Sequence, residues 1–415
     1  MLDAVVIGAG QAGLATSYWL TQRGLSHVVL ERGHVGESWR TQRWDSFVLN
    51  TPSAVSVLPG DPYSGDDPEG FWTCDELLAR FRGYVDRFGL PVRQGVTVVE
   101  VDSMPHGFAV RTEPGEELEA KNIVVASGLM QAQKRPPAAA QVPDTLPSLH
   151  ASEYRNASAL PPGAILVVGA AQSGCQIAED LLAAGRRVYL ATSRVPRVPR
   201  RYRGRDIFAW LDSAGFWAQR PEDLADPAMR YVTQPQISGV GPRGHTVSLQ
   251  WLAERGVALL GRFEGYRDGH LLFGDDLGAN VRFADESSAR MLGMVDAAIE
   301  RMGIAAPPRE DDPADRPHPN PDALNAPRRL DVAGETIGAV VWCTGFTAGF
   351  PWLRVPALDA DGQPVHTRGV SNVPGVYFTG FPWLTSRGSG LIRGAGEDAR
   401  TVVEHLATRA SMSAG

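Results

Sequence analysis

The sequence predicts an α/β fold that contains two strand–turn–helix–strand units. In DAVVIGAGQAGLATSYWLTQRGLSHVVLER, an apolar run leads into a glycine turn and then into a helix that ends at Gly24. The same order recurs in AILVVGAAQSGCQIAEDLLAAGRRVYLATSR, which aligns with the first stretch without a gap at an offset of 161 residues. Both turns begin a helix directly after a strand, as dinucleotide sites do. We therefore expect two Rossmann-like dinucleotide-binding domains.

The length and composition fit a soluble protein of two or three domains. The chain has 415 residues, of which 43% are apolar and 21% charged. Its formal charge of −7 argues against a general nucleic-acid-binding protein. The chain begins with a strand where a signal peptide would need a basic region, and no apolar run approaches the ~18 residues of a membrane span. We expect a cytoplasmic protein with no membrane or nucleic-acid partner.

The cysteines exclude two kinds of site. Cys74, Cys175 and Cys343 lie far apart and form neither a C-x-x-C motif nor a metal-ligand spacing. This usage fits a reducing compartment and argues against a redox dithiol or a zinc site. We expect no bound metal.

The first turn carries a complete dinucleotide motif. Gly8 permits the tight turn, Gly10 lets the backbone approach a pyrophosphate, and Gly13 lets the helix pack closely on the strand. Glu31 follows Gly8 by 23 residues, and a carboxylate at this spacing accepts hydrogen bonds from an adenosine ribose.

The motifs GAGQAG and ERGHVGESW resemble the FAD site of flavin-containing monooxygenases and their N-hydroxylating and Baeyer–Villiger relatives. Glu31, Gly36 and Trp39 match the family pattern, whereas Glu37 replaces a second glycine and leaves the local backbone open. The resemblance continues through RWDSFVLNTP, HASEY, the second turn and CTGF, and it misses only residues 200–320 or so. It implies an FAD site formed by Gly8, Gly10, Gln11, Ala12, Gly13, Glu31, Arg32, Ser38, Trp39, Gly128, Gly390 and Leu391.

The second turn has Ala171 where the first has its middle glycine. The helix N-terminus and Ser173 remain available as donors to a phosphate. Thr192, Ser193 and Arg194 occupy the positions that follow the second strand, where a hydroxyl and a guanidinium favour the 2′-phosphate of NADPH over NADH. The alternative is a structural turn beside a solvated arginine. The predicted NADPH residues are Gly169, Ala171, Gln172, Ser173, Gly174, Ser193, Arg194 and Thr344.

Further arginines follow this strand in SRVPRVPRRYRGRD. In an acidic chain we interpret them as phosphate binding together with some solvated charge, and not as a nucleic-acid footprint.

Several single residues have two interpretations. The resemblance places Asn50 beside the isoalloxazine ring as a donor, but an Asn before Thr-Pro is equally a turn residue. His150 and Tyr154 fit the family spacing before the second site, and we interpret His150 as a marker of the crossing between domains. The resemblance also points the N-terminus of the last helix, near Gly390 and Leu391, at the flavin pyrimidine, where it would stabilise negative charge.

The expected architecture is a three-layer ββα FAD domain with an NADPH domain inserted into it. The boundaries are 1–160 for the first part of the FAD domain, 161–326 for the NADPH domain with a substrate-side insertion at about 200–320, and 327–415 for the second part. Proline-rich stretches on either side of the second unit are expected to mark the crossings.

The resemblance implies an NADPH-consuming, FAD-dependent monooxygenase in which a C4a-(hydro)peroxyflavin oxygenates a nitrogen or sulfur atom of a small molecule. The partners are that substrate and molecular oxygen, and a homodimer stays open. Two alternatives are an NADPH-dependent flavin reductase or oxidase that releases hydrogen peroxide, and a non-catalytic FAD-binding redox sensor.

Overall fold

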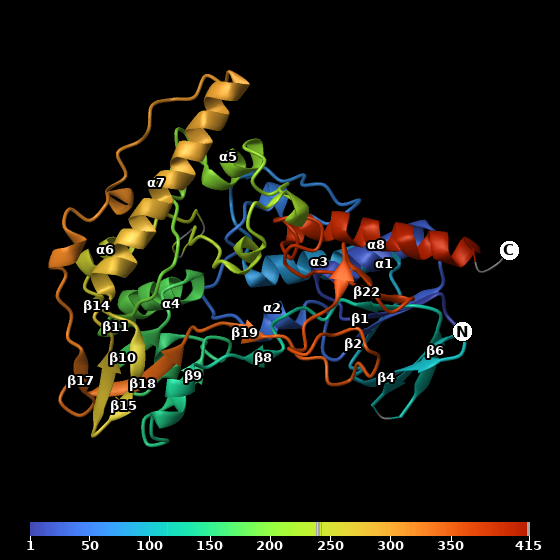
Figure 1. Cartoon of the computed structure of the whole chain (residues 1–415), viewed down its shortest axis with the longest axis horizontal. Helices are drawn as coiled ribbons and strands as arrows, with labels where there is room; N and C mark the ends of the chain where they lie inside the picture. The colour runs from blue at the N-terminus through green and yellow to red at the C-terminus, as the bar shows by residue number, and fades with distance from the viewer. Residues whose placement is uncertain (114, 238, 240, 242, 413–415) are drawn as a thin grey trace.

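Two mainly parallel sheets lie side by side along the long axis of the molecule (Figure 1). The computed structural model describes residues 1–113, 115–237, 239, 241 and 243–412. In this part of the chain, no helix is both long and apolar enough to cross a membrane.

The first sheet has the strand order β20-β21-β22-β7-β1-β2-β3, and its strands from β22 to β3 are parallel. The strands are β1 (Ala4–Ile7), β2 (His27–Glu31), β3 (Val92–Gln94), β7 (Ile123–Val125), β20 (His366–Thr367), β21 (Val370–Ser371) and β22 (Val376–Phe378).

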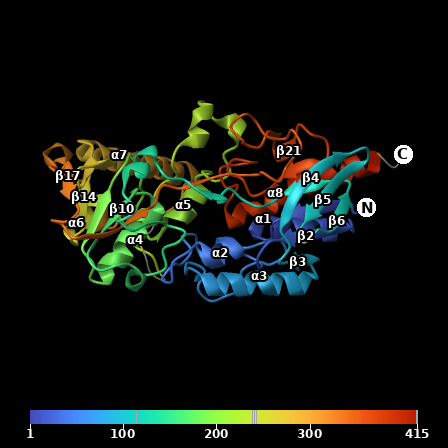
Figure 2. The ribbon, with the colours of Figure 1, turned by 90° about the horizontal axis from the view of Figure 1, so that it is seen from below.

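Successive side chains of a strand point to opposite faces of the sheet, and both faces of the first sheet are apolar and covered. Val6 and Val124 face the helices, whereas Val5 and Ile7 pack against an antiparallel sheet. The helices are α1 (Gln11–Gln22), α3 (Cys74–Phe88) and α8 (Ile392–Met412), and the antiparallel strands are β4 (Val98–Met104), β5 (Gly107–Thr112) and β6 (Glu117–Ala120). The predicted three-layer ββα domain is confirmed. Figure 1 shows α1 and α8 above β1 and β2 and the strands β4–β6 below them, and in Figure 2, seen from below, β4–β6 overlie α8.

The second sheet repeats this arrangement. Its order is β14-β11-β10-β18-β9, all parallel, with β9 (Ser148–His150), β10 (Ala164–Val168), β11 (Val188–Ala191), β14 (Ala258–Leu260) and β18 (Ile337–Trp342). One face packs on α4 (Gln172–Ala183) and the other on the antiparallel strands β15 (Phe263–Arg267), β16 (His270–Phe273) and β17 (Arg329–Asp331). Because β9 and β18 belong to it, this sheet extends beyond the expected range 161–326 at both ends.

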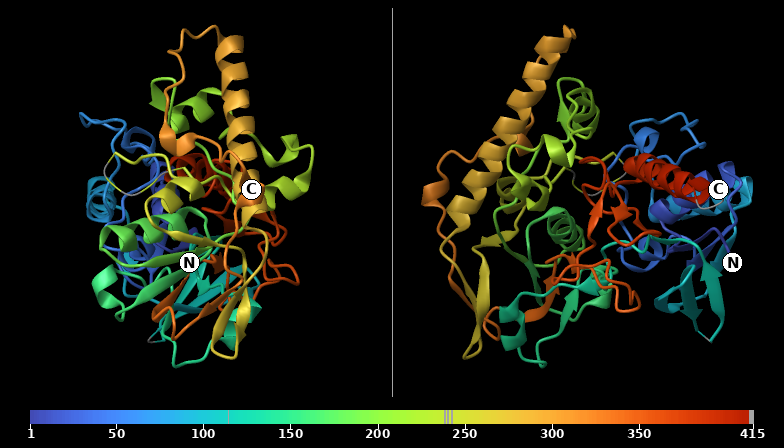
Figure 3. Two further views of the ribbon diagram at one scale, coloured as in Figure 1. Left: turned by 90° about the vertical axis from the view of Figure 1, so that its left-hand side faces the viewer. Right: turned by 45° about the vertical axis from the view of Figure 1, so that its right-hand side comes forward.

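Within the range 200–320, β14, β15 and β16 belong to the second unit, and the other described elements form a mainly helical cap beside it. The cap contains β12 (Arg201–Tyr202), β13 (Arg205–Asp206), α5 (Ile207–Ser213), α6 (Leu249–Glu254) and α7 (Leu277–Met302). Trp210, Phe216 and Ile299 belong to one buried cluster between α5 and α7, so part of its aromatic content is core. Figure 3 shows α7 projecting beyond the rest of the molecule.

The chain crosses between the sheets at β8 (Ala132–Gln133) and β19 (Phe346–Thr347), which pair with each other. The first proline-rich stretch, 136–147, follows this crossing and contains a 3-10 helix at Pro137–Gln141. The second, 307–327, instead runs from α7 to β17 and stays with the second sheet. The expectation that it marks a crossing is therefore wrong, because its prolines serve a connection within one unit. Other short elements are α2 (Glu37–Thr41) and 3-10 helices at Ser53–Val55, Ala157–Ala159, Pro221–Asp223, Pro227–Tyr231, Pro313–Asp315 and Pro321–Ala323.

Candidate active site between the two sheets

A cavity of about 680 Å³ lies between the two units, within the size range of small-molecule and cofactor sites. It opens beside the carboxyl end of β1, where ligands bind in parallel α/β sheets. Of the predicted FAD residues, all but Gly13 line it, and so does Asn50. Of the predicted NADPH residues, Ala171 and Gln172 line the same cavity.

Each glycine of the first turn lies in a different steric environment, which explains why a side chain is absent there. Gly8 has φ = 107°, and a Cβ atom there would lie 2.7 Å from the carbonyl oxygen of Ala126. A Cβ atom on Gly13 would lie 1.8 Å from the Gly8 oxygen, so Gly13 holds α1 against the turn from behind the cavity. At Gly10, by contrast, a Cβ atom would meet no protein atom within 4 Å. The space in front of Gly10 therefore belongs to the cavity.

The N-terminus of α1 is left free for an anion. Gly10 is its N-cap residue, no side chain caps it, and its first turn contains no acidic residue. In α3, by contrast, Thr73 and Glu76 satisfy the same kind of backbone donors in a capping box. Because uncapped N–H groups at a helix start are anion-binding donors, the first turn fits a pyrophosphate.

Glu31 stands at the end of β2 beside this turn. Its carboxylate accepts hydrogen bonds from the backbone N–H of Ala9 at 2.8 Å and of Gly33 at 3.0 Å. Each oxygen keeps a second lone pair. Since Glu31 also lines the cavity next to Arg32, its position fits a ribose diol.

The stretch Gly36–Trp39 resolves the open question about Glu37. The positive φ of this segment, 75°, falls on Gly36, and Glu37 is the first residue of α2. The substitution of the second family glycine therefore strains nothing. Trp39 Nε1 donates to Gln11 Oε1 at 3.1 Å, which ties α2 to α1 at the cavity wall.

Unpaired polar atoms face the cavity from its other side. Ser127 Oγ and Trp383 Nε1 are buried and have no hydrogen-bond partner among the described residues, and both residues line the cavity. Gly128 and Gly390 have φ of 74° and 85° and carry the backbone around this wall. Leu391 directly precedes α8. The cavity thus offers unpaired buried polar atoms, the free amides at the start of α1, and open space in front of Gly10. Together these features fit a large polar cofactor.

Asn50 is held between the two units. Its Oδ1 accepts from Gln176 Nε2 of α4 at 3.0 Å, and its backbone oxygen accepts from Arg200 Nη1 at 2.7 Å. Arg200 is itself fully buried in an ion pair with Asp206. Within the described part of the chain, the Asn50 amide N–H₂ has no acceptor, so it remains a donor for a ligand.

The second turn copies the first in backbone geometry. Gly169 has φ = 106°, and a Cβ atom there would lie 2.5 Å from the backbone oxygen of Cys343. This contact corresponds to the one between Gly8 and the backbone oxygen of Ala126 in the first turn. A Cβ atom on Gly174 would lie 1.7 Å from the Gly169 oxygen. Ala171 caps α4 with φ = −76° and ψ = −172°, against −81° and −173° at Gly10, and α4 also lacks a side-chain cap. The repeat thus includes a third strand, since β18 and Cys343 correspond to β7 and Ala126.

The other predicted NADPH residues lie apart from the cavity. Thr192 is buried and unavailable, because its hydroxyl donates to the Leu260 oxygen at 2.7 Å and accepts from Asn280 at 3.0 Å. Ser193 is half-buried and Arg194 is exposed, with no carboxylate near it among the described residues. Thr344 donates to the backbone oxygen of Lys134 in the crossing segment.

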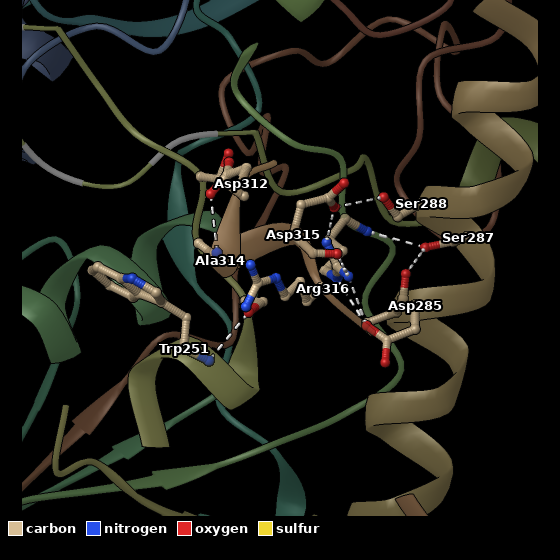
Figure 4. A network of polar contacts seen from close by, with 12 residues as sticks. Trp251, Asp285, Ser287, Ser288, Asp312, Ala314, Asp315 and Arg316 are labelled. Carbon is tan, nitrogen blue, oxygen red and sulfur yellow. Dashed lines mark hydrogen bonds and ion pairs between the residues drawn. The ribbon is translucent and has the colours of Figure 1, made fainter. Parts of the chain in front are cut away.

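The arginines after Arg194 do not act as one phosphate site, so that interpretation is wrong for the cluster as a whole. Arg197 is buried and pairs with Asp285 and Asp315. Figure 4 shows Asp285, Ser287 and Ser288 on α7 opposite Asp315 and Arg316. Arg201 and Arg203 pair with Glu69 and Asp296, and Arg205 stacks on Trp210.

His150, Cys175 and Cys343 are structural. His150 is buried, and its ring nitrogens contact Ser152 Oγ and the Gly345 oxygen, each at 2.9 Å. Burial raises the pKa of Cys175 to about 12 and raises that of Cys343 as well, so neither thiol is poised for redox chemistry. Among the described residues, no group of three or more His, Cys, Asp or Glu side chains could hold a metal.

Sequence reasoning missed several cavity residues with chemical character, among them Arg43, Ser127, Phe208, Trp383 and Arg387. Arg43 lies in the stretch RWDSF that carried the resemblance, and burial lowers its pKa to about 10. Phe208 belongs to the aromatic segment that matched no pattern. Trp383 and Arg387 lie in a loop before α8 that only the fold brings to the cavity.

Comparison with known proteins agrees with this geometry. Residues 5–205 match the family model described as pyridine nucleotide-disulphide oxidoreductase. The chain is 31% identical to the uncharacterized oxidoreductase CzcO of Bacillus velezensis over 98% of this chain and 99% of that protein. It is 30% identical to the indole-3-pyruvate monooxygenase YUCCA1 of rice over 97% of this chain and 91% of that protein.

The chain belongs to the flavin-containing monooxygenase family. A flavin-containing monooxygenase from Stenotrophomonas maltophilia has the same fold, with a TM-score of 0.68 at 20% identity over 99% of both chains. The predicted family and fold class are confirmed, and the protein is a flavin-dependent oxidoreductase of the monooxygenase type. Its two dinucleotide folds are those that hold FAD and a pyridine nucleotide in this family.

Proposed function

We propose that this protein uses NADPH and molecular oxygen to oxygenate a small molecule. One observation carries the proposal: the turns of both βα units open on one cavity, with Gly10 and Gln11 on one side and Ala171 and Gln172 on the other. A dinucleotide on α4 would thus reach a flavin held by α1. The net reaction consumes NADPH, a proton and oxygen, and it transfers one oxygen atom to the substrate and the other to water.

Different residues would bind the two cofactors. The uncapped start of α1, Glu31 and Ser127 would hold FAD, which when bound accepts a hydride and activates oxygen. The start of α4 would hold the pyrophosphate of NADPH. Because Thr192 is engaged inside the protein, Ser193 and Arg194 are the predicted residues of this segment left to bind the 2′-phosphate, and Arg194 supplies the charge.

Asn50 would offer its amide N–H₂ as a hydrogen-bond donor beside the flavin, and the cavity walls would limit the access of water to that place. The favoured reaction is oxygenation of nitrogen or sulfur. Oxygenation next to a carbonyl group is the second candidate, because the rice relative that matches nearly the whole chain is named for a keto acid.

The test starts with anaerobic mixing of the FAD-containing protein and NADPH, followed by air and a count of hydrogen peroxide per NADPH. Rapid flavin bleaching, with a peroxide yield that falls below one when a substrate is present, is the expected result. One peroxide per NADPH with every candidate substrate would indicate an oxidase. Absence of bleaching would reject NADPH as the donor and leave a binding protein.

Replacement of Arg194 by Ala tests the nucleotide preference. Loss of a charge-assisted contact of about 1.5–3 kcal/mol should raise the KM for NADPH by roughly 10- to 150-fold. The KM for NADH should change less than about twofold. Arg201→Ala is the matched control, because Arg201 is an exposed arginine of the same segment that already pairs with Glu69. Equal losses with both nucleotides would reject this role of Arg194.

A further inference from the structure

Arg387 lies on the cavity wall between two aromatic rings. Its Cζ atom is 4.2 Å from the ring centre of Phe216 and 4.6 Å from that of Trp383. Its Nε and Nη2 atoms both donate to Gln219 Oε1, at 3.2 and 3.0 Å. The rings and the amide fix the plane of the guanidinium and leave Nη1 without an acceptor in the described part of the chain.

The charge of Arg387 is not balanced by the protein. Across residues 1–113, 115–237, 239, 241 and 243–412, no carboxylate lies within ion-pair distance of it, and its polar partner Gln219 is neutral. Arg197 and Arg200, which are buried more deeply, each pair with aspartate. Arg43, the other half-buried arginine that lines the cavity, has no ion pair with a described residue either. Burial lowers the pKa of Arg387, because partial removal from water disfavours the charged guanidinium.

Trp383 supplies a second donor at the same place. Its side chain is only 5% exposed, its Nε1 has no partner among the described residues, and it lines the cavity. The residue also has φ = 57°, a conformation that disfavours a bulky side chain. Such strain is retained where the surroundings hold a side chain in a particular position, often at a ligand site.

The adjoining wall is aromatic. Phe208 and Trp217 stack with ring centres 4.5 Å apart and an angle of 22°, and both line the cavity. Leu391, at the start of α8, packs against the cluster that contains these rings. This wall therefore adjoins the part of the cavity where the flavin ring is expected.

We propose that the substrate carries a carboxylate, which Arg387 Nη1 and Trp383 Nε1 bind. Its flat or aromatic body packs on Phe208 and Trp217. The phosphates of FAD have a separate anion site at the start of α1, which leaves Arg387 for another anion. The inference rests on the proposed function for the reaction, but it concerns binding alone and names the substrate class as small aromatic or similarly flat acids.

The test compares indole-3-acetate with indole-3-acetamide, which have nearly the same shape and differ in charge. Binding to the oxidised, FAD-containing protein is measured by calorimetry without NADPH. The wild type should bind the acid at least about tenfold more tightly than the amide. Arg387→Gln should weaken binding of the acid by about 10- to 100-fold and leave that of the amide within about twofold.

Arg400→Gln is the matched control. Arg400 lies on the same helix, α8, outside the cavity lining, and it pairs with Glu397 and Glu404 at 2.7 Å each. It should leave both affinities unchanged. If Arg387→Gln does not fold with FAD, Trp383→Phe is the second variant. It keeps an aromatic ring but removes the N–H, and it should weaken binding of the acid about 3- to 10-fold more than binding of the amide.

Equal loss of both probes in these variants, or a wild type that binds the amide as well as the acid, would overturn the proposal. So would a loss of NADPH affinity in Arg387→Gln with unchanged binding of the acid, which would assign the cation to the nucleotide. Because no turnover is needed, failure of NADPH to reduce the flavin would refute the proposed function without affecting this result.

Discussion

Gly10 and Ala171 offer a paired experiment, because their backbones differ by 5° in φ and 1° in ψ and only one carries a methyl group. A Cβ atom at Gly10 meets no protein atom within 4 Å, so Gly10→Ala adds a methyl that faces only the cavity. The fold should lose no more than about 0.5–1 kcal/mol, from the poorer N-cap preference of alanine. FAD, in contrast, would be displaced from the helix amides.

Loss of one hydrogen bond between these amides and a charged phosphate is worth about 1.5–3 kcal/mol. The Kd for FAD should therefore rise by roughly 10- to 150-fold in Gly10→Ala. Ala171→Gly is the reverse change, and it should lower the KM for NADPH about 3- to 10-fold. It should lower the KM for NADH by the same factor, because the two nucleotides share the pyrophosphate and differ only at the ribose.

The assays are reconstitution of the apoprotein with FAD, followed by flavin fluorescence, and steady-state oxidation of both nucleotides. Thermal unfolding of the apoproteins provides the control for stability. An unchanged Kd for FAD in Gly10→Ala would refute the assignment of the space before Gly10 to the pyrophosphate. An Ala171→Gly variant with unchanged KM for both nucleotides would show that α4 does not bind them through its N-terminus.

Three further predictions concern single side chains. Asn50→Ala should increase the hydrogen peroxide released per NADPH several-fold with unchanged FAD content, and an unchanged yield would assign Asn50 to the turn alone. Glu31→Gln leaves one of the Ala9 and Gly33 N–H groups without an acceptor, so FAD should bind about 10- to 150-fold more weakly while the KM for NADPH stays constant. Burial raises the pKa of Asp398 from 3.8 to about 6, against hydrogen bonds from Thr385 and Ser389. The folded protein therefore keeps a proton that the unfolded chain releases between about pH 4 and pH 6, and stability falls by about 3 kcal/mol as the pH rises through this window. In Asp398→Asn, the free energy of unfolding, measured by urea denaturation at several pH values, should no longer fall across this window. If the free energies of the two proteins change with pH in the same way, the prediction is contradicted.

Local rules were enough to predict the βα units. The need for glycine in the two turns comes from contacts within about 20 residues or with one neighbouring strand, at Gly8, Gly13, Gly169 and Gly174. The spacing of these glycines is therefore enough to predict the turns. The amphipathic pattern of α3 and its capping box are likewise local. This is why the fold class and the two glycine turns could be predicted from the sequence.

The substrate side could not be predicted in this way. Arg387 lies in a loop that contacts Gln219, some 170 residues earlier in the chain. No sequence pattern in either segment predicts this contact. The charge of Arg197 and Arg200 was visible, but their partners Asp285, Asp315 and Asp206 were not identified. A run of arginines has the same appearance in a sequence whether it binds phosphate or is buried in ion pairs.

The first sheet is assembled from both ends of the chain, and this has a consequence for synthesis. Strand β7 pairs with β22, about 250 residues later, and α8 covers α1 through Ala399, Val402 and Leu406. A ribosome therefore releases the complete second unit while the first still has an open strand edge and an uncovered apolar helix face. Until the last 40 or so residues emerge, the nascent chain exposes the surfaces from which aggregates start. Chaperone demand and sensitivity to premature stop codons should thus be concentrated at the C-terminal end, which also carries Trp383, Arg387 and Gly390 of the cavity wall.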